Sequence, residues 1–177
     1  GGTAVRTGQM ALPTAKLSTT PKDEPVRHEG EASAYGRGDY ATAMRLLRPL
    51  ADQGDASAQA SLGTMYTDGQ GVPQDYGEAV KWTRKAAEQG HALAQFALGG
   101  MYQEGRGVTR DYIQAHKWYN LAATTSMGPN PPEADKLVRD VAGQFRSEVA
   151  AKMTSAQIAE AQKLAREWKP NKWMPKE

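Results

Sequence analysis

The stretch SLGTMYTDGQGV at residues 61–72 decides the fold, because the chain repeats it as ALGGMYQEGRGV at residues 97–108. The offset of 36 residues falls among the periods of roughly 20 to 50 residues that are typical of proteins built by stacking one supersecondary unit. The similarity extends beyond this phrase, since Trp82 is followed by Trp118 at the same spacing. The sequence therefore predicts a solenoid of repeated units.

Each copy is expected to form two helices, because apolar residues recur three and four positions apart. The predicted helices are residues 56–67 and 75–89 in the first copy, and 92–103 and 111–124 in the second. Asp75 and Asp111 are suited to cap the second helices, since a short carboxylate accepts from the free N–H groups of the first turn. Gly69 is placed to end the first helix at positive φ, and Pro73 prevents its continuation.

The paired glycines of each copy allow two interpretations. One is a loop that cradles phosphate, and the other is a tight turn between two helices. A Walker loop requires a following Gly-Lys-Ser/Thr, and a dinucleotide loop requires a preceding strand. Neither context surrounds Gly69 and Gly71, or their copies Gly105 and Gly107. The turn is therefore the prediction, and no cofactor is expected.

Composition excludes several classes of site. The 177 residues contain no cysteine, so a Cys-ligated zinc site and thiol catalysis are absent. His28, His91 and His116 are not spaced as metal ligands or as a catalytic set, and no metal or catalytic residue is predicted. The formal charge of +2 is too balanced to indicate a nucleic-acid partner. No apolar run is long enough to span a membrane.

The repeats divide the chain into segments. The expected organisation is a flexible leader at 1–30, an N-terminal half repeat at 31–55, full repeats at 56–91 and 92–127, C-terminal capping helices at 128–169, and a tail at 170–177. The cap is predicted because the last unit of a solenoid otherwise exposes its apolar face. If a signal peptide was removed before Gly1, the bacterial periplasm or export is expected, although the residues themselves assign no compartment.

The cap is expected to contain two helices. The first covers residues 133–153, and its apolar stripe consists of Ala134, Leu137, Val138, Val141, Phe145 and Val149. Thr154 and Gln157 then have the form of a capping box, which marks the start of the second helix. Its apolar face is Ile158, Ala161, Leu164, Ala165 and Trp168.

The stretch DYGEAVKWTRKAAEQGHALAQFALGGMYQEGRGV at residues 75–108 resembles the Sel1-like repeat, a relative of the tetratricopeptide repeat. The resemblance covers roughly residues 35 to 126 and is of the bacterial type without cysteines. Thr83 departs from it, because an aromatic residue usually follows the tryptophan, as Tyr119 does in the second copy. The resemblance implies an all-α solenoid of antiparallel helix pairs and a role as an interaction module or adaptor.

Repeated residues are expected to be structural, because a position that is copied with the unit serves the packing of every unit. These positions are Leu62, Gly63, Tyr66, Gly69, Gly71, Tyr76, Trp82, Leu98, Gly99, Tyr102, Gly105, Gly107, Tyr112 and Trp118. Gln59 and Gln95 also repeat, and their amides either bridge backbone groups where units join or hold a peptide. The first interpretation is favoured, because a buried amide needs a hydrogen-bond partner.

Positions that vary between the copies are candidates for contact with a partner, because the first helix of such a unit tends to line the concave side. The predicted groove residues are Ser57, Ser61, Thr64, Leu93, Phe96, Ala97, Gly100 and Gln103. For Phe96 two roles stay open, since the ring could project into the groove or fill space next to the cap. The cations Lys163, Arg166, Lys169, Lys172 and Lys176 near the C-terminus are expected to form a solvated end rather than an anion-binding surface.

The predicted function is a non-catalytic scaffold that binds a protein or peptide in a concave helical groove, as a monomer. Two alternatives stay open. A small-molecule-binding or hydrolytic envelope protein requires polar groups that converge in a pocket. A structural self-assembly module requires open ends, which the predicted cap disfavours.

Overall fold

The computed structural model describes residue 30, residues 32–125 and residues 133–171. Within these residues the fold is all-helical, and no strand occurs. Residues 1–29 of the predicted leader, the break at 127–132, and most of the tail lie outside the described residues, as do His28, Lys172 and Lys176. The predicted fold class, an α/α solenoid, is confirmed.

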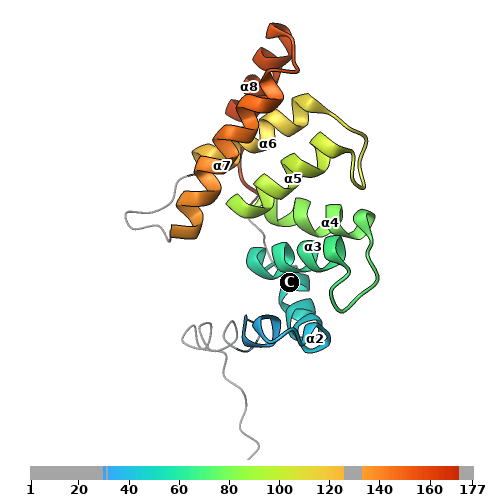
Figure 1. Ribbon diagram of the computed structural model, residues 1–177. Helices are drawn as coiled ribbons and strands as arrows, with labels where there is room; N and C mark the ends of the chain where they lie inside the picture. Colours follow the sequence, from blue (N-terminus) through green and yellow to red (C-terminus); the bar gives the residue numbers. More distant parts are fainter. Residues whose placement is uncertain (1–29, 31, 126–132, 172–177) are drawn as a thin grey trace, which may run out of the picture.

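A short helical segment at residues 32–36 precedes helices that stack in chain order (Figure 1). Their bounds are α2 Tyr40–Asp52, α3 Ala56–Asp68, α4 Tyr76–Glu88, α5 Ala92–Glu104, α6 Tyr112–Thr124, α7 Glu133–Ala150 and α8 Ser155–Glu167. Each helix from α3 to α6 packs against the next, and α7 and α8 close the array against α6. The stack is therefore built from contacts between neighbours, as expected of a solenoid.

The N-terminal caps follow from single side chains. Asp75 accepts from the backbone N–H of Glu78 at 3.0 Å, and Asp111 accepts from Gln114 at 3.1 Å. Both predicted caps are confirmed. Each helix starts one residue after the predicted position, because the capping residue has extended rather than helical backbone.

The glycine turns connect helices within a unit and also touch the preceding unit. Gly69 ends α3 with φ of 68°, and Gly105 ends α5 with φ of 73°. A Cβ added at Gly71 would lie 2.7 Å from the carbonyl oxygen of Tyr40, and one at Gly107 would meet the carbonyl of Tyr76. The second glycine of each pair therefore lets the turn approach the backbone of the previous unit.

The core between units consists largely of alanine with a few large side chains. Leu62 and Leu98 are fully buried, and Trp82 and Trp118 are 4% and 5% exposed. Alanines such as Ala79, Ala86 and Ala87 are also fully buried. Small residues on facing helices allow the helix axes to approach closely, so a few large side chains are enough to fill the core between units.

The predicted stripe of α7 is wrong at its start, since Ala134 and Leu137 are exposed while Val138 is half-buried. Leu137 is 64% exposed, whereas Ala142 is fully buried and was not predicted. Phe145 and Val149 lie in a cluster with Tyr119 of α6. The reason is that α7 crosses the end of the array obliquely (Figure 1), so that its later turns cover the core. The predicted capping box at Thr154 and Gln157 is confirmed.

Candidate functional site

A cavity of about 380 Å³ opens between α3 and α5, the first helices of the two full repeats, and α4 contributes its floor. We call it the α3–α5 groove. The residues that line it are Ser57, Ala60, Ser61, Thr64, Thr67, Tyr76, Thr83, His91, Leu93, Ala94, Ala97, Gly100, Met101, Glu104 and Arg106. This volume lies within the usual range of ligand pockets, roughly 300 to 1,000 Å³.

Two differences between the repeats explain why the groove lies here. The first unit has Ala60 and Thr83 where the second has Phe96 and Tyr119. The larger pair packs together with Phe145 of α7, with ring centroids 5.4 to 5.6 Å apart. The smaller pair lines the groove instead. The groove is therefore the space that aromatic rings fill one unit later.

The hydroxyl groups on the α3 wall are mostly engaged with their own helix. Ser61 donates to the carbonyl of Ser57 at 3.0 Å, and Thr64 donates to the carbonyl of Ala60 at 3.3 Å. Thr67 donates to the carbonyl of Gly63 at 2.8 Å. A hydroxyl has a single hydrogen to donate, so these three present only acceptor lone pairs and methyl or methylene groups to the groove.

Charge is distributed unevenly along the α3–α5 groove. His91 caps α5 at the end where α3 and α5 begin, and its Nδ1 accepts from the N–H of Ala94 at 3.3 Å. Burial lowers the pKa of His91, while the nearby carboxylates of Asp135 and Asp55 act in the opposite direction. At the other end Arg106 and Glu104 form an ion pair of 2.5 Å. The end of the groove at His91 is thus more acidic than the end at Glu104 and Arg106.

The structure brings together six of the eight predicted groove residues, namely Ser57, Ser61, Thr64, Leu93, Ala97 and Gly100. Phe96 lies in the aromatic cluster under α7, so it takes the second of the two roles left open for it. Gln103 accepts a hydrogen bond of 2.7 Å from the hydroxyl of Tyr119. Neither of these two residues lines the groove.

Sequence reasoning missed part of the lining. Thr67 and Glu104 lie one turn beyond Thr64 and Gly100 on the same helix faces, so extending the helical period would have found them. Thr83 comes from α4, and the signal for it was its small size at a position where the second copy has Tyr119.

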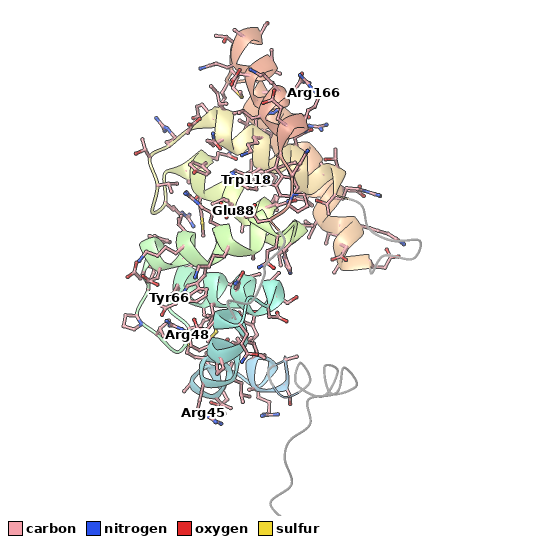
Figure 2. All side chains as sticks on the ribbon, turned by 180° about the vertical axis from the view of Figure 1, so that it is seen from behind. Arg45, Arg48, Tyr66, Glu88, Trp118 and Arg166 are labelled. Carbon is pink, nitrogen blue, oxygen red and sulfur yellow. The ribbon has the colours of Figure 1, made fainter. Side chains whose placement is uncertain are left out.

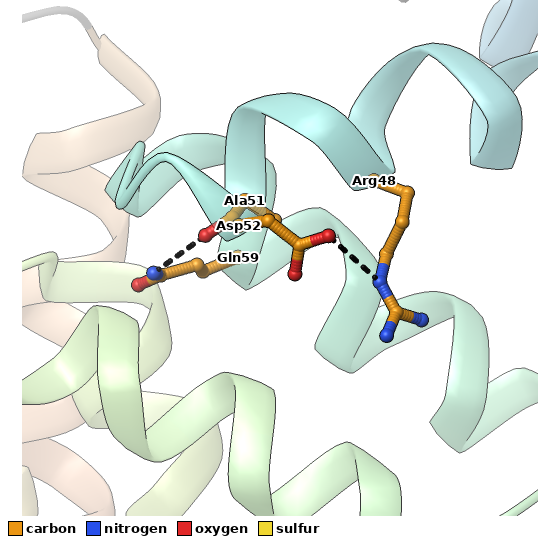
Figure 3. Close-up of polar contacts among 4 residues, drawn as sticks. All are labelled: Arg48, Ala51, Asp52 and Gln59. Carbon is orange, nitrogen blue, oxygen red and sulfur yellow. Dashed lines mark hydrogen bonds and ion pairs between the residues drawn. The ribbon is translucent and has the colours of Figure 1, made fainter.

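The repeated glutamines lie where units join. Gln59 donates to the carbonyl of Ala51 at 3.0 Å, and Gln95 donates to the equivalent carbonyl of Ala87 at 3.2 Å. Figure 3 shows Gln59 reaching back to Ala51, beside the Arg48–Asp52 ion pair on α2. The second helix of the unit supplies the other partner, since Gln89 donates to the Gln59 carbonyl oxygen. These amides are therefore used in joining units.

The segment after α8 folds back across the array. The N–H of Asn171 donates to the carbonyl of Glu88 at 2.7 Å, and Trp168 packs edge-on against Trp118 with ring centroids 6.3 Å apart. Figure 2 labels Glu88 and Trp118 close to each other on the back of the molecule. We call residues 168–171 the C-terminal strap, because they connect the cap to the end of α4.

Other kinds of site find no support in the part of the chain that the structure describes. No group of three His, Asp or Glu residues is placed to hold a metal ion there. None of the described helices combines the length and the apolar character that a membrane span requires.

Comparisons with known proteins agree with this architecture. The model of the Sel1 repeat family matches residues 29–55, 56–91 and 92–124. The chain is similar to c5321, a protective antigen of uropathogenic Escherichia coli strains whose crystal structure displays an SLR fold. The two sequences are 32% identical, and the structures superpose with a TM-score of 0.71 over 82% of this chain and 30% of that chain. A Sel1 repeat protein from Oxalobacter formigenes is 28% identical with a TM-score of 0.54, over 67% of this chain and 54% of its own.

The chain thus spans under a third of the length of the first of these structures and about half of the second. The comparison with functionally curated proteins found no match. Sel1 repeat proteins are generally protein-interaction scaffolds. From the three matched repeats and the stacked helix pairs it follows that this chain belongs to the Sel1 repeat family.

Proposed function

We propose that the chain is a monomeric, non-catalytic scaffold that binds a segment of a partner protein in the α3–α5 groove. The observation that carries the proposal is the groove itself, which exists because Ala60 and Thr83 replace residues that are aromatic in the next repeat. A repeat needs no cavity for its own stability, since the second unit fills the same space with side chains.

The exposed apolar surface supports the same site. Leu93 on the groove wall is 50% exposed, and it is one of two large hydrophobic residues that are exposed in the described part of the chain. Apolar side chains surrounded by polar residues on a concave surface are typical of binding sites. Binding to a largely preformed groove requires little ordering of the scaffold, which favours affinity.

The test is capture of proteins from a bacterial extract by the immobilised chain and by its Ala60→Phe variant. This change places in the first unit the residue that the second unit has at the same position, so the fold should be retained while the groove is filled. Ala159→Phe on the exposed surface of α8 is the matched control. We expect proteins that the wild type and the control retain and that Ala60→Phe loses.

An identical set of captured proteins from all three forms would exclude the groove as the binding surface. Light scattering over a range of concentrations tests the monomeric state, and a mass that rises with concentration would instead favour self-assembly.

A further inference from the structure

The walls of the α3–α5 groove restrict the backbone conformation of an occupant. An extended peptide exposes N–H and C=O groups at every residue, and these groups need partners when they are buried. The α3 wall has three hydroxyls whose hydrogens are already donated within the helix, those of Ser61, Thr64 and Thr67. Of the other polar residues that line the groove, Glu104 and Arg106 form an ion pair with each other and His91 caps α5. A helix satisfies its own backbone and needs none of these groups.

The length of the groove and its small lining residues suit a short helix. From Ser57 to Thr67 the α3 wall rises by about 15 Å, which equals ten residues or about three turns of helix. Small residues on the facing wall, Ala97 and Gly100, leave room for the backbone of a third helix to approach. Leu93 then offers an apolar contact at one end.

The charges give the occupant a direction. The carboxylate of Asp135 on α7 acts on His91, which caps α5 at the end where α3 and α5 begin, and Glu104 at the other end forms an ion pair with Arg106. Basic side chains of an occupant are therefore attracted to the first end. The N-terminal ends of α3 and α5 also carry partial positive charge there, which favours the C-terminal end of an incoming helix.

We infer that the occupant of the groove is an amphipathic helix of about ten residues, antiparallel to α3 and α5, with Lys or Arg in its last turn. The inference rests on the proposed function and specifies its partner. The helix inserts apolar side chains spaced three and four residues apart, because only these lie on one face.

A selection from displayed random 16-residue peptides tests this inference. Peptides are selected on the wild-type chain and counter-selected on Gly100→Leu, which fills the groove. An added Cβ at Gly100 has only the hydroxyl of Tyr119 within 4 Å, at 3.6 Å, so the variant is expected to fold. Gly143→Leu on α7, where a Cβ would meet nothing within 4 Å, is the matched control that should bind like the wild type.

We expect selected peptides with helical apolar spacing and a basic last turn, whose helicity rises on binding. A proline in the middle of the peptide should weaken binding by at least about tenfold, since it breaks the helix. Asp135→Asn should weaken binding about threefold at low ionic strength, whereas Asp140→Asn on the same helix should leave binding unchanged.

Selected peptides that tolerate the central proline, or that carry their basic residues in the first turn, would overturn the inference and leave the groove as a binding site. An absence of any peptide that depends on Gly100 would also overturn it. The extract capture with Ala60→Phe decides separately whether the groove binds proteins, so the two failures can be distinguished.

Discussion

At the scale of single residues, two neighbouring glycines of α5 have different environments. A Cβ at Gly99 would lie 2.7 Å from the Tyr119 ring, whereas a Cβ at Gly100 would lie no closer than 3.6 Å to the Tyr119 hydroxyl. Gly99 therefore allows the two helices of the second unit to pack closely. Gly100 instead leaves space in the groove, because it has no side chain there, although glycine lowers the stability of the helix relative to alanine.

The two glycines should respond in opposite directions to alanine. Gly99→Ala should destabilise the protein by about 1 to 3 kcal/mol, because the ring of Tyr119 or the helix must shift. Gly100→Ala should stabilise it by up to about 1 kcal/mol, because alanine favours the helix and meets open space. Urea denaturation followed by circular dichroism measures both. Equal effects of the two changes would contradict the packing described for Gly99.

His116 is a buried residue whose Nδ1 has no hydrogen-bond partner. Burial lowers its pKa, and the charge of Arg146 lowers it further. A histidine with a lowered pKa in the folded state binds fewer protons than in the unfolded state. The pH-dependent cost of this histidine is therefore absent above pH of about 6.5, where it is neutral in both states, and stability is lost as the pH falls below that value. The lowered pKa of His91 acts with the same sign.

His116→Val introduces the residue that the first repeat has at this position, where Val80 is 6% exposed. We expect the free energy of unfolding at neutral pH to rise by about 1 kcal/mol, because an unsatisfied buried nitrogen is removed. The loss of stability on acidification should also become smaller. Denaturation at pH 7.5 and 5.5 tests both expectations, and a variant less stable than the wild type would indicate that Nδ1 has a partner.

At the scale of elements, the joints between units depend on amide side chains. Gln95 is fully buried and donates to the carbonyl of Ala87, and its carbonyl oxygen shares the single hydrogen of the Thr125 hydroxyl with the carbonyl of Leu121, each at 2.8 Å. Thr125 stands where the first unit has Gln89, so a hydroxyl replaces an amide in the same contact. Both joints therefore contain the central glutamine, while its second partner differs between them.

Gln95→Met should reduce the free energy of unfolding by about 1 kcal/mol, because the Ala87 carbonyl keeps the N–H of Gly90 but loses the amide of Gln95, while the side-chain volume is nearly kept. Gln162→Met on the exposed surface of α8 is the control and should change stability by less than about 0.5 kcal/mol. Thermal unfolding of both variants provides the measurement. A neutral Gln95→Met would show that the amide is not needed at the joint.

Sequence alone predicted the elements well where the repeat period applies. Asp75 and Asp111 cap the helices, since local hydrogen bonds decide where a helix starts. It failed on α7, where Leu137 is exposed and Ala142 buried. Both residues lie on apolar faces of the same helix, and only the crossing angle against α6 decides which of them is covered. That angle depends on tertiary packing and leaves no local signal.

At the scale of the whole molecule, the site was predicted in part. Positions on α3 and α5 follow from the repeat and its variation, whereas the floor at Thr83 depends on which helices surround one space. Phe96 shows the limit most clearly, since its ring lies against α7, an element outside the repeats. A pattern within one unit cannot predict what a cap contributes.

The C-terminal strap joins the cap to the repeats, so its loss should affect the whole array. Trp168→Ala should lower the free energy of unfolding by about 2 kcal/mol, because a half-buried ring and its contact with Trp118 are removed. Lys169→Ala, at an exposed neighbouring position, is the control. Urea denaturation followed by circular dichroism compares the two, and equal stability would mean that the strap is not coupled to the repeats.

The inward hydrogen bonds of Ser61, Thr64 and Thr67 also affect hydration. Water next to these three oxygens in the α3–α5 groove can donate to them but receives no hydrogen from them, so it leaves this part of the wall at small enthalpic cost. Filling the groove should then release solvent and give a negative change in heat capacity. The driving force of such an association weakens on cooling, so a complex formed here at ambient temperature should loosen in the cold.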